Sequence, residues 1–340
     1  MKILIVKLSS LGDVLHNLPI VWDLRAEYPD AQIDWVVEEA YVDLLQPLAS
    51  HGDFRGIDHI LQVGLRRIKK NWRDQSLFKT LKELKHQIKG LQHTSYDIVI
   101  DTQGLLKSAI VAAVVKKNKH ALVIGLGNKT EGSGYEPIVR WFYTQSVRLP
   151  SQTHAVDRSR ALAAVALGKN FPIRALNPPQ FYSDTYQQQL ENLPNPLGLE
   201  KRTYVMFFHA TAKQSKSWAF DHWVELGKWL ALKNLSVVLP WGNESEKMIS
   251  HQLAQEIPNA IVPDAFTITQ AAIINLQSIY VIGVDTGLTH LAAVLSHPTI
   301  EIYVDSPKWK TEGYWSPNIQ NLGDKRSPPT VDEIKKAMTF

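Results

Sequence analysis

Residues 1–16 read MKILIVKLSSLGDVLH. The apolar run at residues 3–6 is closed by Lys7, which predicts a short buried strand and argues against a signal peptide, whose apolar core is longer. Gly12 permits a tight turn, and Asp13 stands where a helix would begin. The opening therefore predicts a strand, a loop and a helix, the unit from which parallel α/β sheets are built.

The same alternation of short apolar runs with longer helical patterns continues in two series. The predicted strands lie at residues 3–6, 33–37 and 98–100, and then at 204–208, 237–239, 280–284 and 299–304. The clearest predicted helices lie at residues 72–91, 220–232 and 267–276. Strands that alternate with helices indicate parallel sheets made of right-handed βαβ units.

A proline-rich stretch separates the two series. The prolines of residues 171–199 are Pro172, Pro178, Pro179, Pro194 and Pro196. Proline removes a backbone donor and interrupts regular elements, so the stretch predicts an interdomain connection. We expect a first domain at residues 1–175, a linker at 176–200 and a second domain at 201–322. Both domains should be doubly wound α/β and face a central cleft, with ligands beyond the carboxyl ends of the strands.

The composition disfavours several classes of protein. The 340 residues include no cysteine, so disulfides, thiolate metal sites and cysteine nucleophiles are excluded. No apolar stretch approaches the roughly 20 residues that span a bilayer, so we expect a soluble or membrane-surface protein. There is no P-loop motif, and the glycine pattern at residues 125–127 lacks the third glycine of a dinucleotide fingerprint. A P-loop ATPase and a hydride-transfer enzyme are therefore disfavoured.

Two features of the first half could bind or activate a substrate. Asp13 could cap its helix, or its carboxylate could take a proton from an attacking hydroxyl. A basic cluster follows at Arg66, Arg67, Lys69 and Lys70. This cluster could hold phosphate or carboxylate groups of an acceptor, or anionic lipid. Nucleic acid is the weaker reading, because the net charge is only +4 and no nucleic-acid motif accompanies the cluster.

Three loops of the second half carry polar residues. Residues 209–218 hold hydroxyls and two lysines, which suit either a phosphate group or an ordinary solvated loop. Glu246 could pair with ribose hydroxyls, although a charge in the first turn of a helix is the simpler interpretation. Residues 283–290 (GVDTGLTH) combine a strand end with a helix N-terminus, a ready anion site. His290 could also be a packing histidine. Asp285 and His290 could together suggest a metal site, but no third ligand is evident.

Several segments together resemble the heptosyltransferases of glycosyltransferase family 9. They run in order along almost the whole chain: residues 5–19 (IVKLSSLGDVLHNLP), 34–39 (DWVVEE), 101–108 (DTQGLLKS), 154–158 (HAVDR), 209–211 (HAT), 216–218 (KSW), 240–242 (PWG) and 284–290 (VDTGLTH). Within the family, residues 35–39 and 66–70 look most like the members that add the first heptose of the lipopolysaccharide core.

The resemblance implies a GT-B fold, with a C-terminal helix at residues 323–340 that packs back onto the first domain. It implies ADP-heptose, with the L-glycero-D-manno sugar, as donor and the Kdo of Kdo-lipid A as acceptor. The family inverts the anomeric centre and requires no metal or other cofactor. A lipid-linked acceptor implies a cytoplasmic enzyme peripherally associated with the inner membrane, and nucleic acid is not an expected partner.

The resemblance also implies roles for individual residues. Asp13 is the expected catalytic base. Thr211 and Lys216 would bind the donor diphosphate, and Glu246 the ribose. The remaining donor contacts would come from Asp285 to the heptose and from Thr286, Gly287 and His290 near the phosphates. The acceptor would be gripped by the basic cluster, Arg66, Arg67, Lys69 and Lys70.

Other functions remain compatible with these motifs. A related transferase could use a second-heptose acceptor or another nucleotide sugar. A nucleotide-sugar epimerase on the same scaffold would turn over donor with no acceptor present. A non-catalytic nucleotide-binding module at a membrane surface would bind ligand and release no product. Fold-level likeness alone does not separate these possibilities.

Overall fold

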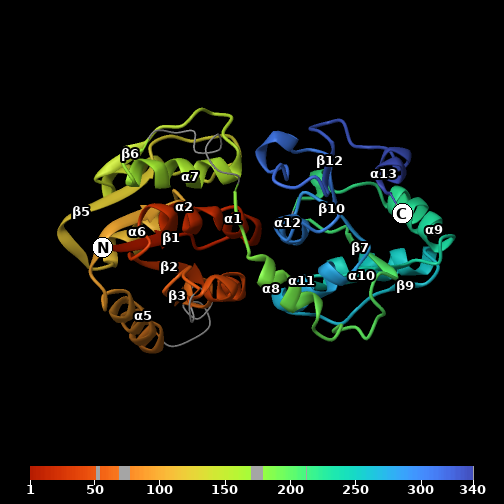
Figure 1. The fold of residues 1–340 in the computed structure, drawn as a ribbon, viewed down its shortest axis with the longest axis horizontal. Coiled ribbons are helices and arrows are strands. Elements are labelled where there is room, and N and C mark those ends of the chain that lie inside the picture. The colour runs from red at the N-terminus through yellow and green to blue at the C-terminus, as the bar shows by residue number, and fades with distance from the viewer. Residues whose placement is uncertain (51–53, 69–76, 170–178, 212, 340) are drawn as a thin grey trace. The chain divides into compact units, whose positions relative to one another are not determined.

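The computed structural model describes residues 1–50, 54–68, 77–169, 179–211 and 213–339. These residues form two compact units, Met1–Gln180 and Phe181–Phe340 (Figure 1). Each unit contains one six-stranded parallel sheet with helices packed against it. The predicted α/β class with two Rossmann-like domains is confirmed.

The first sheet has the strand order of dinucleotide-binding folds. Its strands are β1 (Lys2–Val6), β2 (Gln32–Glu38), β3 (His59–Val63), β4 (Tyr96–Asp101), β5 (Lys117–Leu126) and β6 (Gln145–Val147). Their spatial order is β3-β2-β1-β4-β5-β6, and every neighbouring pair is parallel. Residues 3–6 of the central strand β1 are fully buried, as expected for a parallel sheet covered on both faces.

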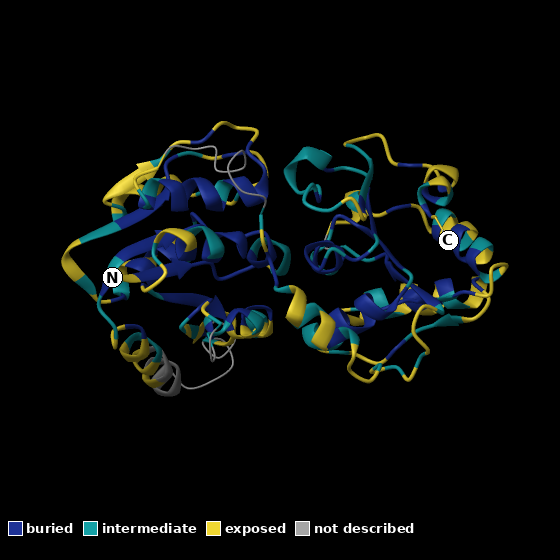
Figure 2. Cartoon of the chain, in the orientation of Figure 1, coloured by how far each residue is buried: buried dark blue, intermediate teal, exposed yellow. Residues whose placement is uncertain are grey.

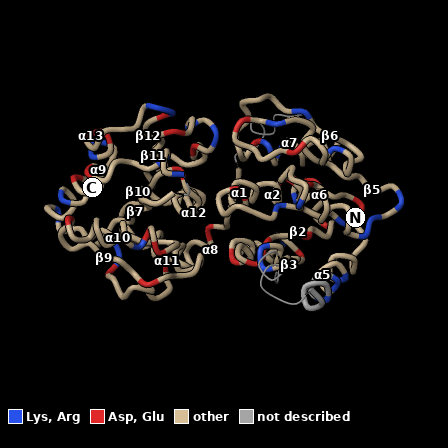
Figure 3. The backbone as a smooth tube through the Cα atoms, turned by 180° about the vertical axis from the view of Figure 1, so that it is seen from behind, with Lys and Arg blue, Asp and Glu red and all other residues tan. Residues whose placement is uncertain are grey.

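The helices of the first unit pack on this sheet and on one another. They are α1 (Leu11–Leu15), α2 (Pro19–Glu27), α3 (Val42–Leu45), α5 (Leu77–Leu91), α6 (Leu106–Val114) and α7 (Ala155–Ala166), with 3-10 turns η1 (Glu39–Tyr41), η2 (Gln46–Leu48) and η3 (Pro137–Phe142). Arg160 of α7 is buried and forms a two-pronged ion pair with Asp23 of α2 at 2.7 and 2.8 Å. Lys82, Lys85 and Lys89 of α5 are exposed, and Figure 3 marks the lysine positions along this helix in blue.

The second sheet repeats the design. Its strands are β7 (Tyr204–Phe208), β8 (Ser236–Val238), β9 (Ala260–Ile261), β10 (Tyr280–Val284), β11 (Thr299–Tyr303) and β12 (Ile319–Gly323). The spatial order β12-β11-β10-β7-β8-β9 is that of the first sheet read from the other edge, and all pairs are again parallel. The central strands of each sheet are almost entirely buried (Figure 2).

The helices of the second unit cover that sheet. They are α8 (Asp184–Glu191), α9 (Phe220–Ala231), α10 (Glu244–Glu256), α11 (Ile268–Gln277), α12 (Gly287–Val294) and α13 (Val331–Ala337), with 3-10 turns η5 (Gln214–Lys216) and η6 (Lys308–Lys310). Aromatic packing links α9 to the sheet, since the ring centroids of Trp223 and Phe207 are 4.8 Å apart. Trp218 packs edge-on against Trp223 at 5.0 Å and completes this aromatic core.

Each sheet reverses its strand order at one point. In the first unit the reversal lies between β1 and β4, and in the second between β7 and β10. The loops that follow adjacent strands diverge at such a point and leave room for a ligand. The loops after these four strands are therefore the places to examine for a site.

One predicted boundary differs from the structure. Part of the predicted linker at 176–200 is helix α8, which packs on α11 of the second unit, and Gln277 donates to the carbonyl of Leu193 at 2.7 Å. The prolines flank this helix without preventing it. Helix α13 packs within the second unit, and the expected contact of this helix with the first domain stays a prediction. Its residues Val331 and Ile334 are buried in the core of the second unit, beside α9.

The described residues include no helix that is both long and apolar enough to cross a membrane. The helices of both units are instead short elements that pack on the sheets.

Candidate active site

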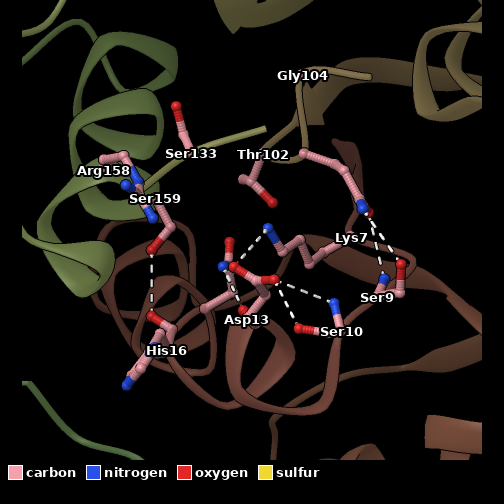
Figure 4. A network of polar contacts seen from close by, with 12 residues as sticks. Lys7, Ser9, Ser10, Asp13, His16, Thr102, Gly104, Ser133, Arg158 and Ser159 are labelled. Atoms are coloured by element: carbon pink, nitrogen blue, oxygen red, sulfur yellow. Dashed lines mark hydrogen bonds and ion pairs between the residues drawn. The ribbon is translucent and has the colours of Figure 1, made fainter. Parts of the chain in front are cut away.

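The loop after β1 positions Asp13 at the start of α1. The Asp13 carboxylate accepts a hydrogen bond from the Ser10 backbone N–H at 3.2 Å and another from the Ser10 hydroxyl at 2.8 Å. These bonds fix the carboxylate against the turn that begins the helix (Figure 4). The capping interpretation of Asp13 is thus correct, and it leaves the carboxylate oriented for a second role.

The surroundings of Asp13 favour its ionised form. Desolvation raises the pKa of this carboxyl, but the Lys7 ammonium, the two hydrogen bonds from Ser10 and the nearby Arg158 outweigh it and lower the pKa below its usual value. Lys7 Nζ lies 3.7 Å from Asp13 Oδ1, and 41% of the Asp13 side chain is exposed. Asp13 is therefore an accessible carboxylate at neutral pH, which is what a general base requires.

The loop after β4 meets the loop after β1 at the reversal point of the sheet. The Gln103 side-chain oxygen accepts from the N–H groups of Leu8 at 2.8 Å and Ser9 at 3.2 Å. Lys107 Nζ donates to Ser9 Oγ at 2.8 Å. This places Lys107 in the neighbourhood of Lys7, whose ammonium borders Asp13, and burial lowers the pKa of both lysines.

Three cations consequently surround the Asp13 loop. They are Lys7, Lys107 and Arg158, and Figure 4 shows Arg158 reaching from α7 toward the Asp13 and Lys7 side chains. Such a group suits an anionic substrate. All three lie within the family motifs of the sequence, where they were assigned no role. For Lys7 and Lys107 a signal was available, because Lys7 directly follows β1 and Lys107 lies at the start of the helix after β4.

Asp101 ends β4 and has a structural role. One of its oxygens accepts from the Gln103 N–H at 2.9 Å, and the other accepts from the hydroxyls of Ser108 at 2.9 Å and Tyr143 at 2.8 Å. Gly104 follows in the left-handed region, at a φ of 73°. Asp101 thus organises the β4–α6 turn.

The predicted acceptor cluster is only partly described. Lys69 and Lys70 lie outside the described residues. Arg67 is engaged by Glu39, with its Nε 3.1 and 3.2 Å from the two carboxylate oxygens. The Arg66 guanidinium is exposed and lies over the Tyr41 ring at 5.4 Å. Arg66 thus keeps more capacity for an anionic ligand than Arg67 does.

In the second unit, the loop after β10 carries the most connected carboxylate of the site. Asp285 is buried and accepts from Lys216 Nζ at 2.5 Å and from the Ser306 hydroxyl at 2.6 Å through one oxygen. Its other oxygen lies 3.1 Å from His290 Nε2 and 3.2 Å from the Thr311 hydroxyl. The structure therefore brings together the predicted residues Lys216, Asp285 and His290.

The charge states within this cluster follow from the contacts. His290 Nδ1 lies 2.8 Å from a carboxylate oxygen of Glu301, a buried residue of β11 that sequence reasoning missed. Burial alone would lower the pKa of His290, but Glu301 and Asp285 outweigh it and raise the pKa to about 10. Burial likewise opposes ionisation of Asp285, but His290 and Lys216 hold its pKa well below the usual value.

The start of α12 adds an anion-binding feature beside this cluster. Thr286 is the N-cap residue and Gly287 the first helical residue, and both are half-buried. N–H groups of a first helical turn have no intrahelical partner and attract negative charge. Thr211 lies in the loop after β7, the strand next to β10. Phosphate oxygens at this reversal point would meet Lys216 and the α12 N-terminus.

Glu246 lies on α10, one strand further along the sheet. Its carboxylate accepts from the Gly242 N–H at 2.8 Å, and its own N–H donates to the Asn243 side chain at 3.0 Å. This agrees with the simpler reading of a residue that stabilises the start of its helix. The ribose-binding role of Glu246 stays a prediction.

Comparisons with known proteins agree with this arrangement. A family model described as glycosyltransferase family 9 (heptosyltransferase) matches residues 84–338. Lipopolysaccharide heptosyltransferase 1 of Escherichia coli O18:K1:H7 (strain RS218 / NMEC) is 34% identical over 340 residues, covering 99% of this chain and 96% of its own. The protein of the same name from Pseudomonas aeruginosa PAO1 is 33% identical over 342 residues, covering 100% and 88%.

Solved structures give the same result. The E. coli heptosyltransferase WaaC with ADP is 31% identical and has a TM-score of 0.80, covering 99% of this chain and 98% of its own. WaaC with ADP-2-deoxy-2-fluoro heptose has a TM-score of 0.76 over the same shares of both chains. These similarities extend over both units.

Proposed function

The chain belongs to glycosyltransferase family 9, and on that premise we propose that it transfers L-glycero-D-manno-heptose from ADP-heptose to the Kdo of Kdo-lipid A in lipopolysaccharide core synthesis. The relatives at 33 and 34% identity are named heptosyltransferase 1, which supports the first-heptose reaction. WaaC bound to an ADP-heptose analogue supports the donor. One observation carries the proposal: Asp13 is an exposed, ionised carboxylate within a group of cations at the reversal point of the first sheet.

The donor belongs to the second unit in this proposal. Lys216 and the N-terminus of α12 would bind the diphosphate, with Thr286 and Gly287 supplying hydroxyl and N–H donors. Asp285 would accept hydrogen bonds from heptose hydroxyls, exchanging one of its present donors. As the bond to ADP breaks, negative charge grows on the diphosphate, and donors fixed in advance stabilise it most effectively.

The acceptor belongs to the first unit. Kdo carries a carboxylate, and Lys7, Lys107 and Arg158 provide complementary charge around Asp13. Asp13 takes the proton of the attacking Kdo hydroxyl, whose oxygen forms the new bond to the anomeric carbon. The anomeric bond to the ADP oxygen breaks in the same displacement, so configuration inverts. The positive groups of the second unit balance the leaving diphosphate, and no metal is required.

Attachment to the inner membrane at its cytoplasmic face is part of the same proposal. On η3, Trp141 is 89% exposed and Ile138 is 55% exposed, with exposed Arg140 between them. Exposed tryptophan beside arginine suits the interface of an anionic bilayer. This turn packs against α6, and the Leu106 N–H donates to Glu136 at 2.6 Å. A lipid-linked acceptor would then meet the protein close to the helix that carries Lys107.

The test measures ADP release from ADP-heptose with and without Kdo-lipid A, beside Asp13→Ala. We expect acceptor-dependent release that falls at least about 10²-fold in the variant, the usual contribution of a general base. Asp30→Ala, at a side chain that is 99% exposed, is the control and should turn over normally. Addition of EDTA should leave the rate unchanged.

The alternatives predict other outcomes of the same assay. Donor turnover without acceptor would indicate an epimerase. Binding of ADP with no release of product would indicate a non-catalytic module. Release of the nucleoside diphosphate with other nucleotide sugars or acceptors, but not with this pair, would indicate a transferase with different substrates.

A further inference from the structure

Glu301 is a fully buried carboxylate in the second sheet. It lies in β11, whose other residues are apolar or carry only hydroxyls. Besides His290, its carboxylate accepts from the Tyr303 hydroxyl at 3.0 Å and from the Gly313 N–H at 3.1 Å. Burying an ionised carboxylate is costly unless charged and polar partners compensate it. Those partners are present, so Glu301 can keep its charge in the interior.

His290 lies between two carboxylates. An ionised carboxylate only accepts hydrogen bonds, and the two ring nitrogens of His290 face Glu301 and Asp285 at 2.8 and 3.1 Å. A neutral imidazole donates from one nitrogen only, whereas the imidazolium donates from both. The geometry therefore requires the cationic form of His290, in the same direction as its raised pKa.

Among the described residues, Glu301 and Asp285 are the charged groups that act on the pKa of His290. The loop after β10 contributes Asp285, and β11 contributes Glu301 with the Tyr303 phenol. Lys216 reaches the group only through Asp285. Helix α11, which packs on α12, has the sequence ITQAAIINLQ, and α12 itself reads GLTHLAAV, so neither adds a further ionisable side chain.

We propose that Glu301 is a positioning residue for the transfer reaction, whose charge keeps His290 doubly protonated beside Asp285 at the start of α12. The charges of Lys216, Asp285, His290 and Glu301 alternate in sign and cancel. Without the charge of Glu301 the buried group carries an excess positive charge, which it relieves by releasing the proton of His290. The positive charge near the leaving diphosphate is then lost.

This inference rests on the proposed function, because its catalytic consequence assumes a diphosphate at the α12 N-terminus. The consequence is a dependence on pH that the native enzyme lacks. With Glu301 present, His290 stays charged up to a pH of about 10, so its titration does not affect turnover between pH 6 and 9. With a neutral residue at this position, only Asp285 would oppose the effect of burial, so the pKa of His290 would fall and the imidazolium would lose its proton at a lower pH than in the native enzyme.

The kinetic test is the pH profile of Glu301→Gln with ADP-heptose and Kdo-lipid A. We expect kcat to fall about tenfold or more between pH 6 and 8.5 in the variant, while the KM for donor changes less. A tenfold change corresponds to about 1.4 kcal/mol, within the range of one electrostatic contact to a developing charge. Tyr303→Phe is the matched control: it removes one hydrogen bond from the same carboxylate but keeps the charge, and its profile should stay flat.

The outcomes separate charge from packing. A steep profile in Glu301→Gln with a flat one in Tyr303→Phe supports the proposal. An equal loss of kcat in both variants at every pH would overturn the proposal, since it would mean that only the shape of the pocket matters. A flat profile in Glu301→Gln would overturn it as well.

A second measurement needs neither substrates nor a variant at position 301. Proton–nitrogen NMR of the whole protein, with His290 assigned by its absence in His290→Gln, should show both ring nitrogens protonated at pH 8. An unprotonated ring nitrogen at that pH would refute the proposal. If native protein releases no ADP from these substrates, the proposed function fails while the NMR result still judges the charge state of His290.

Discussion

Asp101 and Asp285 occupy equivalent positions in the two units. Asp101 is the last residue of β4 and Asp285 directly follows β10, and each strand is the fourth of its sheet in chain order. Their partners differ in kind. Asp101 binds the backbone and hydroxyls of its own turn and of Tyr143. Asp285 binds Lys216, His290 and two hydroxyls that come from separate segments. The same topological position is therefore used for structure in one unit and for a charged cluster in the other.

This difference makes Asp101 a stability residue. Asp101→Ala leaves two backbone N–H groups and two hydroxyls without their buried acceptor. We expect the free energy of unfolding to fall by about 2 kcal/mol, the scale of a lost buried hydrogen-bond acceptor. Thermal unfolding by calorimetry measures the change, and Asp30→Ala should stay close to the native value. Equal melting curves for the two variants would contradict the structural role of Asp101.

Lys7 should determine the pH below which the activity is lost. The base Asp13 works when ionised, so activity is present above its pKa and is lost as pH falls through it. The Lys7 ammonium is a main cause that lowers this pKa, against the effect of burial. Lys7→Met keeps the buried stem without the charge, so the acid limb of kcat/KM should move to higher pH. A limb that stays in place would mean that Lys7 does not control the base.

Two lysines of one loop offer a matched pair for donor binding. Lys216 is half-buried and bonded to Asp285, whereas Lys213 is exposed. Lys216→Ala should raise the Kd for ADP by roughly 10- to 100-fold, the effect of losing about 1.5–3 kcal/mol from a charged hydrogen bond. Lys213→Ala should change it by less than about threefold. Calorimetric titration with ADP measures both, and similar losses would remove the diphosphate role of Lys216.

Trp141 should anchor the protein to anionic lipid. Trp141→Ser should weaken sedimentation with vesicles that contain phosphatidylglycerol, because an amphipathic ring leaves the bilayer interface. Leu232, which is 85% exposed on the second unit, supplies the control variant Leu232→Ser. The rate with a water-soluble Kdo acceptor should be the same in native protein and both variants. Unaltered sedimentation of Trp141→Ser would move the membrane contact elsewhere.

The alternation of apolar runs with helical patterns was sufficient to predict both sheets and the strands at their centres. Strand β10 matches its predicted range of 280–284, because buried parallel strands are continuously apolar. Strand β5 was missed because it opens with Lys117, Asn118, Lys119 and His120, which are polar and largely exposed. The helix α8 was missed because flanking prolines dominated the interpretation of its segment.

The site was predictable only where its residues are neighbours in the chain. Asp285, Thr286, Gly287 and His290 share one strand-to-helix connection, and one pattern located them together. Glu301 lies within the strand predicted at residues 299–304, and nothing in the local sequence indicates that it faces His290. The pairing of Lys216 with Asp285 spans 69 residues and follows from adjacency of β7 and β10. Such pairings need the strand order as well as the sequence.

The burial of α13 among the core residues of the second unit has a practical consequence. The last helix remains with its own sheet, so a single cut after Gln180 divides the chain into two pieces that each hold a whole sheet with its helices. Residues 181–340 contain Thr211, Lys216, Glu246, Asp285 and His290. Under the proposed function that piece holds the donor-binding residues, so donor analogues can be screened on it without the lipid acceptor or its detergents.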